Sequence, residues 1–165
     1  MNDSRAVAAH SRRSPTAHEL RVWREYVETG DRIRSLLAAR LQIESGLSMA
    51  DYAVMLALSE AEGKRLRSSE LASAIDWERS RLSHHLGRME ARGLVVREAS
   101  PTDNRGAEAV LTAEGASQYR RASASHLRAV QELFVEAFAA APGEPARGLE
   151  AVEEMTRMLR SHLPV

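Results

Sequence analysis

Residues 79–97 decide the fold, and they read RSRLSHHLGRMEARGLVVR. Leu82, Leu86 and Met89 recur at intervals of four and three residues, which places them on one side of a helix. Gly93 closes this pattern, as glycine commonly does after the last helical turn, and the LVVR that follows is typical of a short strand. The stretch therefore predicts a helix with one apolar side, followed directly by a strand.

The other sides of this helix are basic. Five arginines and one acid, Glu90, stand between Arg79 and Arg97, so these nineteen residues carry a local charge of +4. The whole chain of 165 residues has 23 basic and 23 acidic residues and no net charge, which argues against a strongly basic nucleic-acid binder. The arginines are nevertheless gathered in one segment, where their forked side chains suit phosphates and guanine edges.

The segments on either side complete a winged helix-turn-helix. Ser48 and Asp51 have the spacing of a helix-capping pair, and the tripeptide EGK ends the helix that they open. A short helix is expected at 70–75, followed by a turn, Asp76-Trp77-Glu78. After the basic helix, the run SPTDNRG at 100–106 is dense in turn formers and predicts a two-stranded hairpin with a long tip.

Three further helices are expected outside this region. The first begins near Thr16 and ends at Gly46, the second runs from Thr112 to about Ala141, and the third opens at Pro145. Together they carry more apolar surface than one small domain covers, which favours a second copy of the chain as partner.

The predicted fold class is mainly α with a small β-hairpin wing: a winged helix-turn-helix with long flanking dimerisation helices. Residues 1–15 are expected to be a flexible tail, 16–47 and 113–165 a helical dimerisation region, and 48–112 the DNA-binding region. The tail has a charge of +2, which fits either plain solvation or contact with an anionic partner.

Composition excludes several classes of site. With no cysteine, the chain has no disulfide, thiolate metal site or thiol nucleophile. No apolar run reaches the roughly 18 residues of a membrane span, and the N-terminus lacks the apolar core of a secretory signal, so a cytoplasmic protein is expected. The sequence has no nucleophile elbow and no H-x-x-x-H spacing, so it predicts neither an enzyme nor a metal or other cofactor.

The basic helix has two interpretations. As a reader of the DNA major groove, it directs arginines at guanine edges and serine or histidine side chains at bases and phosphates. As an ordinary surface helix, it is merely solvated. Its place between a turn and a hairpin favours DNA, and the candidate DNA-binding residues are Arg79, Ser80, Arg81, Ser83, His84, His85, Arg88, Asp103, Asn104 and Arg105.

Several segments, taken together, resemble the MarR family of regulators. They are Leu71-Ala72, residues 79–95, Asp103-Asn104-Arg105 and Leu111-Thr112-Ala113-Glu114-Gly115. The last two are similar to the family's D-x-R motif in the wing and to the LTxxG start of its fifth helix. The likeness extends from about Leu20 to Leu163.

This resemblance implies a function and an assembly. It implies an obligate homodimer, joined by the first, fifth and sixth helices, on a palindromic operator in double-stranded DNA with half-sites roughly one helical turn apart. It also implies that Arg105, positioned by Asp103, enters the minor groove, although an ordinary polar turn explains these residues equally well. Family members are usually repressors released by a small, often aromatic effector.

The turn at residues 76–78 departs from the family pattern. The family often has glycine, an aliphatic residue and a small polar residue where this chain has Asp76, Trp77 and Glu78. An acid at position 78 weakens contact with nearby phosphates unless it caps the helix, where the positive helix end favours it.

Trp23, Tyr26, Tyr52 and Met55 are the candidate lining of an effector pocket between the first two helices. Residues of these types at helical spacing are also typical of a plain core, and they do not identify an effector.

Two rival interpretations come from other classes of protein. One is a winged-helix module that binds a protein and not DNA. The basic charge of the helix and wing argues against this interpretation. The other is the dimerising part of a small-molecule methyltransferase, for which the chain is too short to add a cofactor domain.

Overall fold

The structure is a computed structural model that describes residues 14–100, 103–139 and 145–163. The predicted flexible tail therefore lies almost wholly outside the described residues. The contacts of the chain divide it into two compact units, 1–34 and 35–165.

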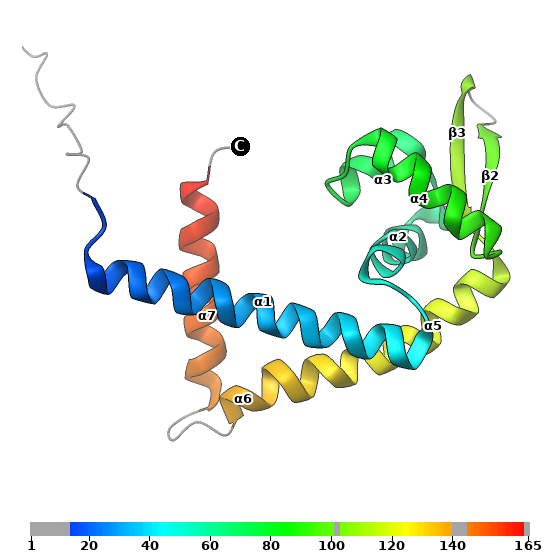
Figure 1. Cartoon of the computed structure of the whole chain (residues 1–165). Helices are drawn as coiled ribbons and strands as arrows, with labels where there is room; N and C mark the ends of the chain where they lie inside the picture. Colours follow the sequence, from blue (N-terminus) through cyan, green and yellow to red (C-terminus); the bar gives the residue numbers. More distant parts are fainter. Residues whose placement is uncertain (1–13, 101–102, 140–144, 164–165) are drawn as a thin grey trace, which may run out of the picture. The chain divides into compact units, whose positions relative to one another are not determined.

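The first helix, α1 (Ala17–Ser45), begins in the N-terminal unit, next to the start that the sequence predicted near Thr16 (Figure 1). Thr16 and Glu19 fix its start by reciprocal hydrogen bonds. The amide of Thr16 donates to Glu19 Oε2 at 2.6 Å, and the amide of Glu19 donates to Thr16 Oγ1 at 3.2 Å. Such an exchange satisfies two of the amides that a helix start leaves without partners.

The other helices belong to the second unit. The helix-turn-helix region consists of α2 (Met49–Glu60), a 3-10 turn η1 (Glu62–Lys64), α3 (Ser68–Ala74) and α4 (Arg79–Ala91). The C-terminal part consists of α5 (Ala113–Val130), a π-helical turn η2 (Gln131–Val135), α6 (Glu136–Ala139) and α7 (Pro145–His162). The single helix predicted from Thr112 to about Ala141 is thus divided by the π-helical turn.

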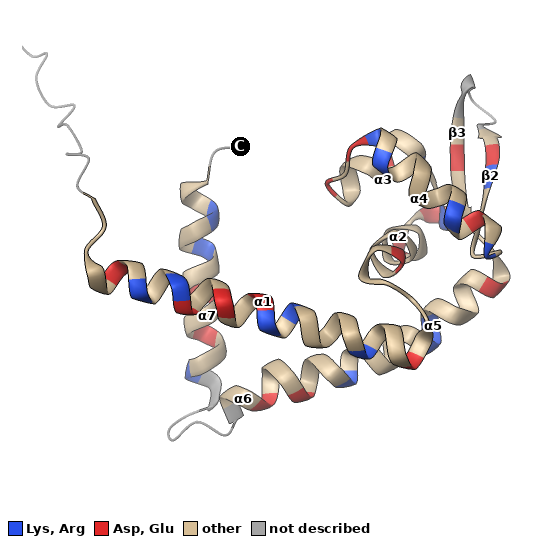
Figure 2. Ribbon diagram, in the orientation of Figure 1, with Lys and Arg blue, Asp and Glu red and all other residues tan. Residues whose placement is uncertain are grey.

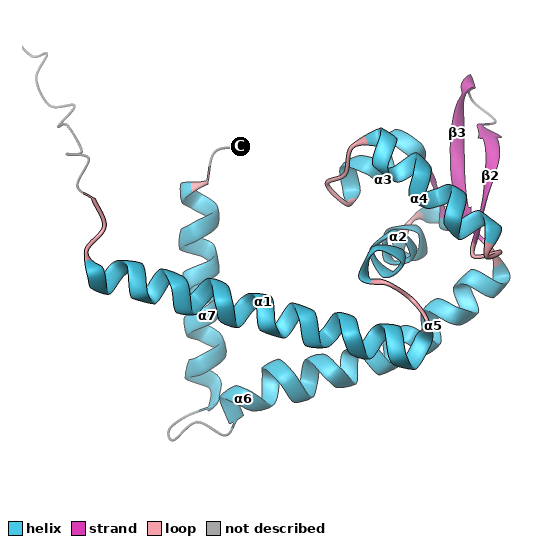
Figure 3. Cartoon of the chain, in the orientation of Figure 1, coloured by secondary structure: helices cyan, strands magenta, loops and turns pink. Residues whose placement is uncertain are grey.

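The sheet differs from the predicted two-stranded hairpin. It has three antiparallel strands in the order β1-β3-β2, formed by β1 (Arg65–Arg67), β2 (Val95–Ser100) and β3 (Asp103–Leu111). Strands β2 and β3 are labelled in Figure 3. The strands extend almost to the tip, so the predicted long turn is wrong. Strand β1 has only the residues RLR, which are too few for an alternating pattern. Its partners in β3 lie more than 40 positions later in the chain, so the pairing leaves no local sequence signal.

The core of the second unit is built on the predicted apolar side of α4. Leu82, Leu86 and Met89 are fully buried, and they share one hydrophobic cluster with residues of α2, α3, β2, β3 and α5. Because packing fixes one side of α4, its opposite side is held toward solvent. The second unit thus confirms the predicted fold class, a winged helix-turn-helix with long flanking helices.

The start of α5 is held tightly against the junction of α4 and β2. Thr112 caps α5 by accepting a hydrogen bond from the amide of Gly115 at 2.9 Å, and its hydroxyl donates to the carbonyl of Gly93 at 2.7 Å. A Cβ on Gly115 would lie 2.0 Å from the carbonyl oxygen of Leu94, so the close approach requires glycine. This contact is the physical reason for the LTxxG pattern.

None of the helices in the described ranges is long and apolar enough to cross a lipid bilayer.

Candidate nucleic-acid interface

Six of the predicted DNA-binding side chains lie on the exposed side of α4. We call them the basic face, and they are Arg79, Ser80, Arg81, Ser83, His84 and Arg88. Because the opposite side of the helix is buried, the backbone that carries the basic face is rigidly anchored in the unit. The first turn of α4 offers free backbone amides and the positive end of the helix dipole beside these side chains.

Glu78 stands directly before this face, as the N-cap residue of α4. Its carbonyl accepts a hydrogen bond from the amide of Leu82 at 3.0 Å, but its side chain makes no capping hydrogen bond. The acid therefore lies next to the positive helix end without satisfying an amide there.

His85 corrects the sequence prediction. It was expected on the DNA-facing side, but the residue is only 6% exposed, so it does not belong to the basic face. The signal was present in the sequence, because position 85 lies three residues after Leu82 and four before Met89, the same steps that define the apolar side. Polarity alone suggested the wrong side of the helix.

The buried imidazole of His85 joins two groups of opposite charge. Its Nδ1 lies 2.8 Å from Nη2 of Arg88, and its Nε2 lies 3.1 Å from Oδ1 of Asp51, off the direction of a regular hydrogen bond. Burial lowers the pKa of His85, and the nearby Arg88 lowers it further, whereas Asp51 acts in the opposite direction. The neutral ring then accepts from the Arg88 guanidinium.

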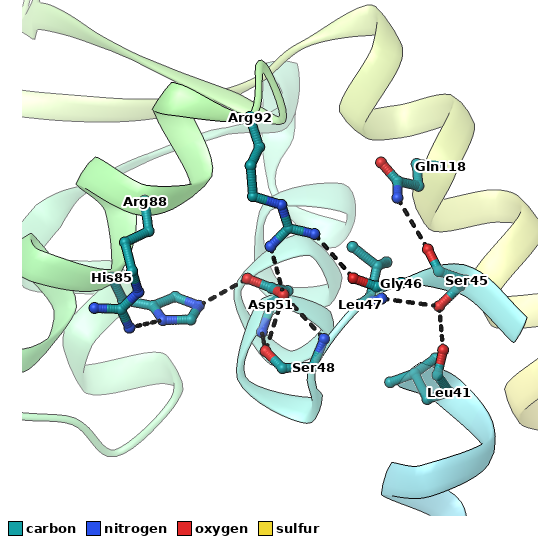
Figure 4. Close-up of polar contacts among 10 residues, drawn as sticks. All are labelled: Leu41, Ser45, Gly46, Leu47, Ser48, Asp51, His85, Arg88, Arg92 and Gln118. Carbon is teal, nitrogen blue, oxygen red and sulfur yellow. Dashed lines mark hydrogen bonds and ion pairs between the residues drawn. The ribbon is translucent and has the colours of Figure 1, made fainter. Parts of the chain in front are cut away.

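Asp51 is the centre of this polar cluster (Figure 4). The residue is 3% exposed. Its carboxylate accepts hydrogen bonds from the amide and the hydroxyl of Ser48, both at 2.9 Å, and from Nη1 of Arg92 at 2.9 Å. Burial raises the pKa of Asp51, but the hydrogen bonds from Arg92 and Ser48 outweigh it and hold the pKa below its ordinary value. The carboxylate links the start of α2 to α4.

Two arginines of the basic segment have acidic partners within the protein. Arg92 binds Asp51 and also donates to the carbonyl of Gly46 at 3.1 Å, and Arg97 forms an ion pair with Glu90 at 2.7 Å. The local charge of +4 counted from the sequence therefore overstates what is available to a ligand. Arg79, Arg81 and Arg88, all on the basic face, make no ion pair among the described residues.

The predicted turn residues of the wing belong to a strand. Asp103, Asn104 and Arg105 are part of strand β3, but their side chains lie outside the described residues, so the predicted Asp103–Arg105 salt bridge stays a prediction. At the side of the sheet, Arg65 of β1 lies 3.4 Å from both Glu98 and Glu108. Figure 2 shows that basic and acidic residues both occur along α1 and along α7.

The four candidate effector residues belong to different units. Trp23 and Tyr26, in the N-terminal unit, are 61% and 48% exposed, and their ring centroids are 6.2 Å apart. Tyr52 and Met55, in the second unit, are members of the hydrophobic core. For this second pair the structure favours the plain-core interpretation over a pocket lining.

A hollow of about 430 Å³ lies beside the basic face, and it includes residues that the sequence prediction missed. It is lined by Gln42, Gly46, Ser48, Ala50, Asp51, Trp77, Arg81, His85, Arg88 and Arg92. The capping pattern had singled out Asp51, but only as a helix start, and nothing local indicated its contact with Arg92, 41 residues later. No group of three potential metal ligands occurs among the described residues.

Comparisons with known proteins agree with this geometry. A family model described as MarR family matches residues 45–106. Sco3205, a MarR family transcriptional regulator from Streptomyces coelicolor solved in complex with DNA, is 34% identical, with coverage of 93% of this chain and 92% of that one and a TM-score of 0.80. AbsC, a MarR family transcriptional regulator from the same organism, is 36% identical, with coverage of 91% and 99% and a TM-score of 0.75.

A more distant likeness extends to fold alone. BpsR from Bordetella bronchiseptica, whose DNA binding is described as regulated by 6-hydroxynicotinic acid, is 18% identical, with coverage of 92% and 100% and a TM-score of 0.70. A comparison with curated protein sequences yields no match. The identity to Sco3205 and AbsC over nearly the whole chain, together with the winged helix-turn-helix and its outward basic face, shows that the chain belongs to the MarR family of transcriptional regulators.

Proposed function

We propose that the chain binds double-stranded DNA sequence-specifically as a homodimer, on a palindromic operator, and represses transcription until a small aromatic effector releases it. The observation that carries the proposal is the basic face of α4. It directs three arginines, two serines and a histidine outward from a helix whose other side is locked in the core. The width of the major groove admits one helix, and arginine is the side chain best suited to guanine O6 and N7.

The wing adds the second proposed contact. Asp103, Asn104 and Arg105 are proposed to approach the minor groove next to the site of α4, with Arg105 inserted. In this proposal residues 48–112 bind DNA, and the complex of Sco3205 with DNA supports it, since that relative shares 34% of its residues with this chain.

The homodimer and the effector rest on separate support. The C-terminal helix α7 leaves Leu149, Met158 and Leu159 exposed, and Leu163 directly after it is exposed as well, an apolar surface of the kind that proteins cover with a partner. A second copy of 16–47 and 113–165 is the proposed cover.

The regulation of BpsR by 6-hydroxynicotinic acid supports an aromatic effector, with Trp23 and Tyr26 as the exposed aromatic candidates.

Gel-shift titration on the DNA upstream of the chain's own gene tests DNA binding. We expect a retarded complex whose affinity falls steeply as salt rises, because each phosphate contact releases counterions. Arg105→Ala should weaken the complex and leave the dimer intact. If the dimeric protein retards no fragment even at low salt, the protein-binding module becomes the better interpretation.

A further inference from the structure

Two aromatic rings support the basic face of α4 from beneath. Trp77, in the turn before α4, is packed against the hydrophobic core. Its indole meets the buried ring of His85 edge-on, with ring centroids 5.3 Å apart and planes at 87°. Trp77 and His85 therefore form one rigid surface below the exposed side chains.

Arg81 rests on the first of these rings. Its guanidinium carbon lies 4.0 Å from the centroid of the Trp77 ring, within the range of a cation–π contact. Among the described residues, no acceptor binds the guanidinium of Arg81. The indole thus restrains the direction of this side chain while its N–H groups stay available for a ligand.

Arg88 is restrained by the second ring. Its Nη2 lies 2.8 Å from Nδ1 of His85, and the opposite nitrogen of that ring contacts the buried carboxylate of Asp51 at 3.1 Å. Positions 81, 85 and 88 are four and three residues apart, so both arginines flank His85 along α4. One buried histidine is thereby connected to two exposed arginines.

We propose that Trp77 and His85 are positioning residues that set the base preference of α4 by holding the guanidinium groups of Arg81 and Arg88 in place before DNA arrives. A long side chain that is already oriented loses less conformational freedom on binding, so its contacts contribute more to affinity and discriminate more sharply between bases. The inference rests on the proposed function, because it assigns a mechanism to the same DNA-binding face.

A double-mutant cycle on full-length protein tests the contact between Trp77 and Arg81. The probe is the duplex most enriched by the wild-type protein from a random-sequence pool, and a scrambled duplex of the same composition measures non-specific binding. Trp77→Leu should weaken binding of the selected duplex about threefold to tenfold, the equivalent of one cation–π contact. In the Arg81→Ala background the same change should have almost no effect, because the side chain that Trp77 positions is gone.

Two further variants separate positioning from simple packing. Trp77→Phe keeps an aromatic face under Arg81 and should retain most of the affinity. Ile75→Ala is the matched control, because Ile75 also packs against the core from the turn but has no aromatic ring on which a guanidinium could lie. It should lower the melting temperature without energetic coupling to Arg81→Ala.

His85→Phe tests the second contact. It keeps a ring against Trp77 but removes the nitrogen that accepts from Arg88. On duplexes with single base substitutions, discrimination should fall at the bases that Arg88→Ala affects and persist at those that Arg81→Ala affects.

The inference is overturned if the effects of Trp77→Leu and Arg81→Ala are additive while the variants remain folded. If Trp77→Leu does not fold, Trp77→Met, which also removes the aromatic face, replaces it in the cycle with Arg81→Ala, and additivity there overturns it equally. If the wild-type protein itself does not prefer the selected duplex over the scrambled one, the proposed function fails rather than this positioning role.

Discussion

At the residue scale, the buried carboxylate of Asp51 matters most, because it serves two elements at once. It completes the cap of α2 with Ser48, binds Arg92 at the C-terminal end of α4, and contacts the ring of His85 within α4. Removing a buried acceptor costs free energy of unfolding, because its buried donors are left without hydrogen-bond partners. The helix-turn-helix therefore depends on one side chain outside α4 for part of its geometry.

Asp51→Ala should lower the free energy of unfolding by about 2–3 kcal/mol, the sum of a lost cap and lost buried hydrogen bonds. Urea denaturation measures this directly. Asp31→Ala is the control: it removes an ion pair with Arg34 in which both side chains are more than half exposed. That change should stay within about 0.5 kcal/mol. Equal effects of the two substitutions would contradict the central role of Asp51.

Two histidines, His85 of α4 and the half-buried His126 of α5, are expected to make stability depend on pH. Burial lowers the pKa of His85 and of His126, so each binds a proton in the unfolded chain at a pH where the folded chain does not. Because the unfolded state then holds more protons, stability is full above the ordinary histidine pKa and falls as pH decreases below it. The lowered pKa of Asp51 acts in the same direction but in a more acidic range.

The free energy of unfolding should therefore be lower at about pH 5.5 than at about pH 7.5, on either side of the ordinary histidine pKa. His126→Gln should reduce this difference, because it removes one of the two titrating rings. Urea denaturation at both values is the measurement. Equal stability of the wild-type protein at both values would contradict the lowered pKa of these two histidines.

At the element scale, close packing places α5 against the wing. Gly115 lies so near the carbonyl of Leu94 that any side chain would have to displace backbone. Thr112 holds the same junction by its bonds to Gly115 and to Gly93. The orientation of α5 relative to the sheet thus depends on one glycine and one hydroxyl.

Gly115→Ala should lower the free energy of unfolding by about 2–4 kcal/mol, because a tightly packed backbone contact has no room for a methyl group. The matched control is Gly87→Ala in α4, where an added Cβ meets nothing within 4 Å. There alanine should raise stability by about 0.5–1 kcal/mol through its better helix propensity. Thermal and urea unfolding measure both, and a harmless Gly115→Ala would contradict the close approach.

At the scale of the whole molecule, exposed apolar side chains support the proposed homodimer. The described part of α7 leaves Met158 and Leu159 58% and 45% exposed. A palindromic operator needs two copies of α4 held at a fixed spacing, which a single chain does not provide. A variant that does not dimerise is therefore expected to lose affinity for the operator as well.

Met158→Glu combined with Leu159→Glu should yield monomers, since two charges would have to be desolvated in the proposed interface. Sedimentation velocity measures the oligomeric state, and gel shift should show affinity for the palindrome reduced by at least tenfold, the loss of one half-site. Met49→Glu, an exposed position at the start of α2, is the control and should remain dimeric. A double variant that stays a dimer would exclude α7 from the interface.

The sequence by itself determined the features that arise from local spacing. The apolar side of α4, the capping pair of Ser48 and Asp51, and the start of α5 at Thr112 all follow from contacts between residues three or four apart. Such patterns involve residues that are close in the sequence, so they can be recognised without knowledge of the fold. They sufficed for the winged helix-turn-helix and for most of the basic face.

Only the tertiary structure decided which polar groups are available. It buried His85, bound Arg92 to Asp51, and paired β1 with β3, through partners that lie tens of residues apart. Helical spacing says which residues share a side, but not which carboxylate or ring another element brings against them. That depends on the packing of α2, the turn at Trp77 and α4, because a charge is free or paired according to its neighbours in space and not in sequence.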